Sequence, residues 1–95
     1  MASHTAVTAV HATLTAATVD DVTLSAFTGH FVIINRGTDP ISYLFGAAPG
    51  DPTELDDNTL VVPASAAVTH DWVAGVDLVV KLISAGTPAY SVQAV

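Results

Sequence analysis

The stretch FVIINRGTDPISYLFG, residues 31–46, decides the fold that the sequence predicts. It holds two runs rich in branched and aromatic side chains, 30–36 and 41–46, around the turn sequence GTDP at 37–40. Branched and aromatic residues favour extended backbone, whereas Gly, Asp and Pro favour turns. The stretch therefore predicts a β-hairpin, and the first run, which is apolar on both faces, predicts a central strand covered on both sides.

Five further segments have a similar composition and are bounded by turn residues. They are 19–26, 59–63, 66–74, 76–86 and 88–95, and the last two are expected to form a closing hairpin. Helices are not expected, because the chain has only one Glu, one Gln, one Lys and one Arg for a solvated helix face. Strands at this spacing predict an all-β fold, a small antiparallel β-sandwich or jelly-roll-like domain.

A chain of 95 residues has room for one domain with a single core. We expect the β-sandwich domain to span residues 19–95. Residues 1–18 alternate Thr with Ala or Val, and they predict an extended N-terminal arm that orders on assembly, or else an edge strand. The larger side chains of this segment, Val7, Val10 and Leu14, are candidates for contact with another subunit.

The surface predicted from the composition is poor in charge. Charged residues make up 12% of the chain and hydrophobic residues 51%, and the formal net charge is -7. Nucleic acid and anionic membranes need clustered Lys or Arg, so neither is expected as a partner. No run reaches the roughly 18 apolar residues that span a bilayer, and no basic segment precedes the apolar N-terminal residues as in an export signal. A surface covered by Thr, Ser and Ala suits contact with other protein.

The segment 47–58, AAPGDPTELDDN, is expected to be an exposed loop that carries four of the nine acids. Its oxygen ligands suit calcium, but the glycine and the terminal glutamate of an EF-hand loop are missing. We therefore expect turn hydrogen bonds from Asp56, Asp57 and Asn58 to the backbone rather than a cation site.

No catalytic or cofactor site is predicted. The four histidines lack the spacing of a metal site and lie far apart in the sequence, at His4, His11, His30 and His70. His70 and Asp71 are not expected to hydrogen-bond each other, because neighbouring strand residues point to opposite faces. No serine lies in the GxSxG pattern of a nucleophile.

Three other side chains are candidates for structural or interface roles. Trp72 is the only tryptophan; it suits either a platform for sugar stacking or, as we prefer, packing in the core or against a subunit. Arg36, next to the turn that contains Asp39, is expected to bind an acid or turn carbonyls. Lys81 lies in mid-strand and is expected to reach solvent or an acid.

Three segments resemble a family of small tailed-phage virion proteins that is common in phages of actinobacteria. They are INRGTDPISYLFG, GDPTELDDNTLVVPASAAVTHDW and VVKLISAGTPAYSV, and the likeness covers most of residues 19–93. Such proteins show an "NRG...PI" hairpin, a "GDNT.VVPAG" loop and strand, and a "VKLIS.GTP.YSV" terminus. Here the GDN of the loop is split as GDPTELDDN, so contacts made by that loop in the family do not transfer to this chain.

The resemblance implies a capsid decoration protein, bound to the outside of the head through the phage major capsid protein. It further implies self-association, with a homotrimer favoured, synthesis in the host bacterial cytoplasm, and a final place on the capsid exterior. Two alternatives stay open: a tail or head–tail structural component, and a carbohydrate-binding β-sandwich that uses Trp72 and the 47–58 loop.

Overall fold

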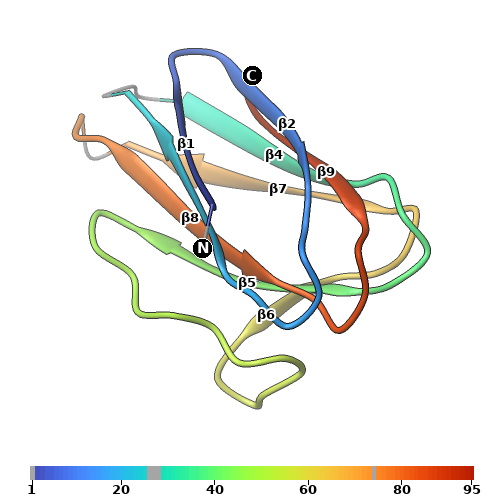
Figure 1. Ribbon diagram of the computed structural model, residues 1–95. Helices are drawn as coiled ribbons and strands as arrows, with labels where there is room; N and C mark the ends of the chain where they lie inside the picture. The colour runs from blue at the N-terminus through green and yellow to red at the C-terminus, as the bar shows by residue number, and fades with distance from the viewer. Residues whose placement is uncertain (1, 26–28, 74) are drawn as a thin grey trace.

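The computed structural model describes residues 2–25, 29–73 and 75–95, and every regular element in these ranges is a β-strand (Figure 1). The strands are β1 (Ala2–Ala6), β2 (Ala9–Thr13), β3 (Asp20–Leu24), β4 (Gly29–Asn35), β5 (Ile41–Gly46), β6 (Leu60–Val62), β7 (Ala67–Trp72), β8 (Leu78–Ile83) and β9 (Ala89–Ala94). The described ranges hold no helix of the length and apolarity that a membrane span requires.

Two sheets face each other. Sheet A has the strand order β1-β3-β8-β5-β6 and sheet B the order β2-β9-β4-β7. Neighbouring strands are antiparallel apart from β1 and β3, which run parallel. This arrangement confirms the predicted all-β class and the antiparallel β-sandwich.

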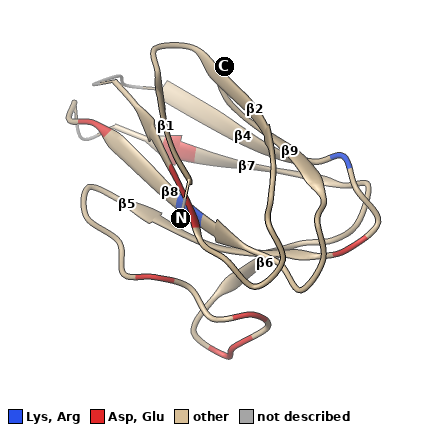
Figure 2. Ribbon diagram, viewed as in Figure 1, with Lys and Arg blue, Asp and Glu red and all other residues tan. Residues whose placement is uncertain are grey.

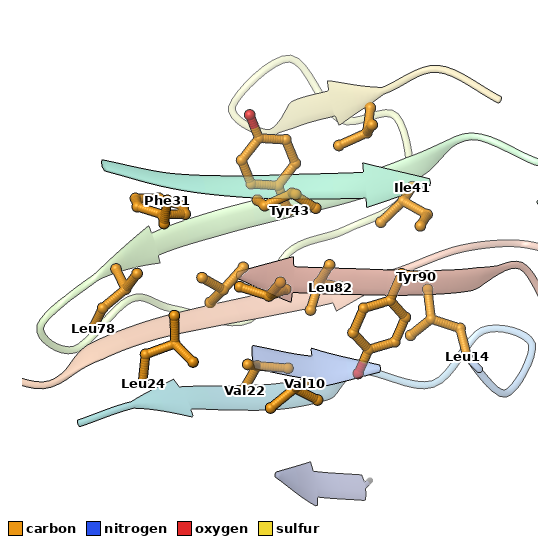
Figure 3. Packing of buried hydrophobic residues seen from close by; sticks show 14 residues of the cluster. Val10, Leu14, Val22, Leu24, Phe31, Ile41, Tyr43, Leu78, Leu82 and Tyr90 are labelled. Carbon is orange, nitrogen blue, oxygen red and sulfur yellow. The ribbon is translucent and has the colours of Figure 1, made fainter. Parts of the chain in front are cut away.

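The core lies between the sheets, because successive strand residues alternate between the two faces. In β4 the inward residues Phe31 and Ile33 are fully buried, whereas the intervening Val32 and Ile34 point outward and stay partly exposed. Figure 3 shows the buried side chains of both sheets meeting in one layer. They are Val10, Leu14, Val22, Leu24, Phe31, Ile33, Ile41, Tyr43, Val62, Leu78, Val80, Leu82, Tyr90 and Val92. Each large member contributes about 1.5–3 kcal/mol through the apolar surface it removes from water.

The predicted hairpin of 30–36 with 41–46 is wrong, although both strands are present. β4 pairs with β7 and β9 in sheet B, and β5 pairs with β6 and β8 in sheet A. The expected closing hairpin is wrong in the same way, because β8 and β9 belong to different sheets. Both turns carry the chain from one sheet to the other.

These two crossing turns pack against each other at one corner of the sandwich. The side-chain amide of Asn35 donates to the carbonyls of Asp39, at 2.7 Å, and Val62, at 3.2 Å, while its oxygen accepts from the amide of Gly37 at 2.9 Å. Gly37 lies so close to Pro88 that an added Cβ would collide with the proline ring and Cα. This corner, and not strand pairing, holds the turns in place.

The second crossing turn contributes its own polar contacts. Ser84 donates its hydroxyl to the carbonyl of Pro40 at 2.8 Å and accepts from the amide of Gly86 at 3.2 Å. Gly86 faces the side chain of Asp39, and there is no room between them for a Cβ. Asp39 therefore has a structural position inside the fold.

Residues 2–13 form β1 and β2, which are edge strands of the two sheets rather than an arm that leaves the sandwich. Val10 and Leu14 are 7% and 1% exposed and belong to the core of the same chain, whereas Val7, in the turn between the strands, is 72% exposed. Of the three expected contact residues in this segment, only Val7 is available to a partner.

The 47–58 segment folds back across the outer face of sheet A. The amide of Leu55 donates to the hydroxyl of Ser42 at 2.8 Å, and the ammonium of Lys81 donates to Asp51 at 3.1 Å. Beneath this loop Ser42 and Ile83 are 2% and 9% exposed although both point away from the core. The loop therefore covers sheet A at Ser42 and Ile83, whereas Val32 and Ile34 on the outer face of β4 stay partly exposed, which corrects the prediction that β4 is covered on both sides.

Candidate binding surfaces

An aromatic cluster occupies the flank where β5 and β7 face each other from opposite sheets. The ring of Phe45 lies 4.5 Å from that of His70 and 5.1 Å, edge-on, from that of Phe31. Phe45, His70 and Trp72 are partly exposed because β7 is an edge strand with no neighbour on its far side. This flank is the one place in the described ranges where several aromatic rings reach solvent together.

Tyr43 connects this cluster to the core, because its ring is buried and its hydroxyl contacts His70. Its hydroxyl lies 2.5 Å from Nε2 of His70, and burial raises the pKa of Tyr43. The hydroxyl therefore keeps its proton at neutral pH and can donate it to the imidazole. His70 is thereby fixed in orientation beneath Phe45.

Trp72 packs against the core cluster, and its indole Nε1 donates to the carbonyl of Val76 at 2.9 Å. The ring thus closes the turn between β7 and β8 and keeps only part of its surface in water. The preferred reading of Trp72 as a packing residue agrees with this position within the chain.

The outer face of sheet B carries a row of polar contacts. Nε of Arg36 donates to the hydroxyl of Ser91 at 3.2 Å, and Nη2 donates to the carbonyl of Tyr90 at 3.2 Å. Nδ1 of His11 lies 2.7 Å from the same serine oxygen. Arg36 therefore binds a hydroxyl and a strand carbonyl, and these contacts include neither the acid nor the turn carbonyl that the sequence predicts.

Two contacts between a basic and an acidic side chain lie at the surface. His30 and Asp71, directly opposite each other on β4 and β7, approach to 2.5 Å on the outer face of sheet B. His70 points inward to Tyr43, so the prediction that His70 and Asp71 point apart is confirmed. The expected acid partner of Lys81 is Asp51, on the covering loop.

A buried polar contact that the sequence did not suggest joins the two sheets. Asp20, on β3, is 2% exposed, and the hydroxyl of Tyr90, on β9, donates to its carboxylate at 2.9 Å. Nε2 of His4 is 3.7 Å from the same carboxylate oxygen. Desolvation, together with the hydrogen bond to Asp20 and its charge, raises the pKa of Tyr90. An acid at the start of a strand is typical of a turn, so its burial could not be predicted from the sequence.

The acidic loop is built around turn hydrogen bonds, as expected for Asp56. Its carboxylate accepts from the amide of Asn58 at 3.2 Å, and its carbonyl accepts from the amide and hydroxyl of Thr59. In the described residues no three His, Asp or Glu side chains gather as they would around a metal ion. No pocket opens in the surface of the same residues.

Exposed valines gather at one end of the sandwich. Val7 is 72%, Val73 74%, Val76 46% and Val95 76% exposed. They lie at this end because β2 begins there and β7 and β9 end there. The hydrogen bond from Ala94 to the carbonyl of Thr8 joins the segments of Val7 and Val95, and the bond from Trp72 to Val76 joins those of Val73 and Val76. We call these four residues the valine end. Figure 2 shows that most acidic residues lie elsewhere, many of them on the loop below β5 and β6.

Comparison with known proteins identifies the fold alone. No protein-family model matches the chain, and no curated protein matches it. Among solved structures, CBM_E1, a carbohydrate-binding module found in a sugar cane soil metagenome and solved with cellopentaose and gadolinium ion, superposes with a TM-score of 0.66 at 16% identity, over 95% of this chain and 88% of that one. PliG of Aeromonas hydrophila, a periplasmic inhibitor of g-type lysozyme, gives 0.58 at 10% identity, over 96% of this chain and 92% of that one.

Proposed function

We propose that this chain is a non-catalytic binding module of a tailed-phage virion, a decoration protein held on the outer surface of the major capsid protein shell. This proposal rests on the positions, in the structure, of the residues that match the family pattern. NRGTDPIS, 35–42, and LISAGTP, 82–88, are far apart in the sequence, yet they form the two crossing turns that pack together at one corner.

The residues that match the family pattern depend on one another in space. The contact of Gly37 with Pro88 joins the two segments, and so does the hydrogen bond from Ser84 to Pro40. These contacts support the resemblance, because the matching residues are neighbours in space. The virion role is proposed from that resemblance.

The valine end is the surface that we assign to the shell. It holds four of the seven exposed large apolar side chains of the described surface, and exposed apolar patches mark sites of protein contact. We do not assign this role to the N-terminal segment as an arm, because Val10 and Leu14 are core residues whose removal would unfold the domain.

The test is co-sedimentation of the purified chain with shells assembled from the major capsid protein. We expect saturable binding that is lost in Val7→Asp and retained in Leu55→Asp, since Leu55 is also exposed, at 65%, but lies on the covering loop. Failure of the wild-type chain to bind shells would contradict the proposal, and equal loss in both variants would remove the valine end from it.

A second candidate is carbohydrate binding, favoured by the fold likeness to CBM_E1 and by the aromatic flank. Sugars stack on aromatic rings, and Phe45, His70 and Trp72 are the partly exposed rings of this flank. The fluorescence of Trp72, the only tryptophan, reports directly on ligands bound there. A shift of that fluorescence on titration with cello-oligosaccharides would support this candidate, and an unchanged spectrum together with no heat of binding would exclude it for these sugars.

A further inference from the structure

The outer face of sheet B has an apolar centre that the described chain leaves open. Val32 and Ile34 project from β4 on this face, and both are partly exposed. On the opposite side of the same strand, Phe31 and Ile33 are fully buried. An internal strand that is apolar on both faces is typical of sheets covered on both sides. β4 thus has the composition of a strand that is covered on both faces, but the described chain covers only its inner face.

On sheet A, the 47–58 loop of the same chain covers part of the outer face. Its outward residues Ser42 and Ile83 are buried beneath the 47–58 loop, which is held by Leu55 and by the pair of Asp51 with Lys81. No described segment lies over Val32 and Ile34 in this way, and both side chains stay partly exposed. Another molecule could cover them.

Polar side chains surround the apolar centre. Thr69 lies beside Val32 on β7, Gln93 lies beside it on β9, and Ser91 and His11 continue the row next to Ile34. An apolar centre within a polar rim is the usual composition of a protein–protein interface. The described part of this face carries no Phe, Tyr or Trp, which distinguishes it from the aromatic flank and from a platform for sugars.

The distribution of acids favours a second copy of the chain as the partner. Asp71 is the acid on this face, and it is paired with His30. The acidic residues Asp51, Glu54, Asp56 and Asp57 all lie on the loop that covers sheet A, on the other side of the sandwich. Two copies that meet through sheet B therefore keep most of their negative charge apart, although each chain carries -7.

We propose that two copies associate face to face through the outer surface of sheet B, across a two-fold axis, with Val32 and Ile34 at the centre. Such a contact uses the same surface on both copies and closes as a dimer, so it replaces the trimer that the family resemblance suggested. Arg36 directly follows the end of β4, whereas Asp71, on β7, lies opposite His30 near the start of β4. Antiparallel stacking therefore turns the Arg36 end of one copy toward the Asp71 end of the other.

The size of the sheet B face gives an estimate of the area buried in the dimer and of its Kd. Four strands spaced about 4.8 Å apart, each contributing about five residues, give a face of about 19 by 17 Å. With the relief of the side chains, the contact buries on the order of 1,000 Å² in total, the low end for a specific interface. We therefore expect a reversible dimer with a Kd between about 10 µM and 1 mM.

Sedimentation equilibrium over about 5 µM to 1 mM tests the dimer. The wild-type average mass is expected to rise from 9.7 kDa toward about twice that value. Val32→Glu and Thr69→Arg, both on the proposed face, are expected to weaken association at least about tenfold, because each places a charge in the contact. Val79→Glu is the matched control: Val79 is also a partly exposed valine on an internal strand, but it points outward from sheet A.

Circular dichroism verifies that each variant is folded. If Val32→Glu is not folded, Thr69→Arg alone provides the test of the sheet B face. A wild-type chain that stays at 9.7 kDa across this range would overturn the proposal. It would also be overturned if the charged variants on sheet B associate as the wild type does, or if Val79→Glu dissociates equally. The valine end is a separate surface, so shell binding can persist or fail independently of this result.

Discussion

The hydroxyl of Tyr90 donates a 2.9 Å hydrogen bond to the buried carboxylate of Asp20, and this contact joins the two sheets through the core. A buried polar group costs free energy unless it is paired, so each partner makes the burial of the other tolerable. The pair lies on the side of the sandwich closed by β1 and β2, near His4. It fixes how the edge strands meet the rest of the fold.

Removing this pairing should destabilise the domain. Asp20→Ala leaves the buried hydroxyl of Tyr90 without an acceptor, and we expect the free energy of unfolding to fall by about 1–3 kcal/mol. Asp21→Ala, the neighbouring acid on the outer face, is the control and should change it by less than about 0.5 kcal/mol. Urea denaturation measures both. Equal losses would mean that the burial of Asp20 has no energetic role.

Alkaline pH should destabilise the folded protein because Tyr43 and Tyr90 are deprotonated more easily in the unfolded chain. The pKa values of Tyr90 and Tyr43 are raised in the folded state, so the folded protein holds these protons more tightly than the unfolded chain does. Stability is therefore constant with respect to these groups below pH 10 and falls as the pH rises above it, by up to about 1.4 kcal/mol per pH unit for each tyrosine. Denaturation curves at pH 8 to about 11.5 measure the slope, and Tyr90→Phe should reduce it. A slope unchanged in that variant would contradict the assignment.

The corner of crossing turns should be intolerant of added volume at Gly37. In Gly37→Ala the new Cβ meets the Cα and Cβ of Pro88, which cannot rotate away, and we expect a loss of about 1–3 kcal/mol. Gly50→Ala is the control, because an added Cβ there meets open space. Thermal unfolding of the two variants provides the comparison, and a Gly37→Ala protein as stable as Gly50→Ala would show that the corner can relax.

Arg36 should matter more for stability than Lys81. Arg36→Ala removes two donors, to Ser91 and to the carbonyl of Tyr90, and we expect a loss of about 1 kcal/mol. Lys81→Ala breaks a pair with the exposed Asp51, and such surface pairs contribute about 0–1 kcal/mol. Chemical denaturation at low and high salt separates the two, since only the Lys81 contribution should fade with added salt. A larger loss for Lys81→Ala would reverse our assignment.

The strands could be predicted from the sequence, but their partners could not. Residues 41–46 were expected as a strand and form β5, because β-branched and aromatic residues bounded by turns identify an extended segment. The residues of the GTDP turn predict that the chain reverses, as in a hairpin, but they do not determine which sheet the chain enters. The side chain of Asn35, bound to Val62 from another strand, decides that question through contacts distant in sequence.

The binding surfaces were harder to foresee. Val10 and Leu14 are predicted at an interface because the residues around them are too small to anchor a core, yet both are buried in the core of the same chain. The flank of Phe45, His70 and Trp72 arises because β5 and β7 face each other from different sheets, which strand composition does not determine. Lys81 pairs with an acid, Asp51, as predicted, because the long side chain of a lysine in mid-strand reaches an acidic loop that covers the sheet.

We propose that this chain decorates a phage head, and a density map of the virion whose genome encodes it examines that role. We expect β-sandwich density on the outer surface of the shell, with the valine end of Val7, Val73, Val76 and Val95 against the major capsid protein. Particles without this chain, or density confined to the tail, would contradict it.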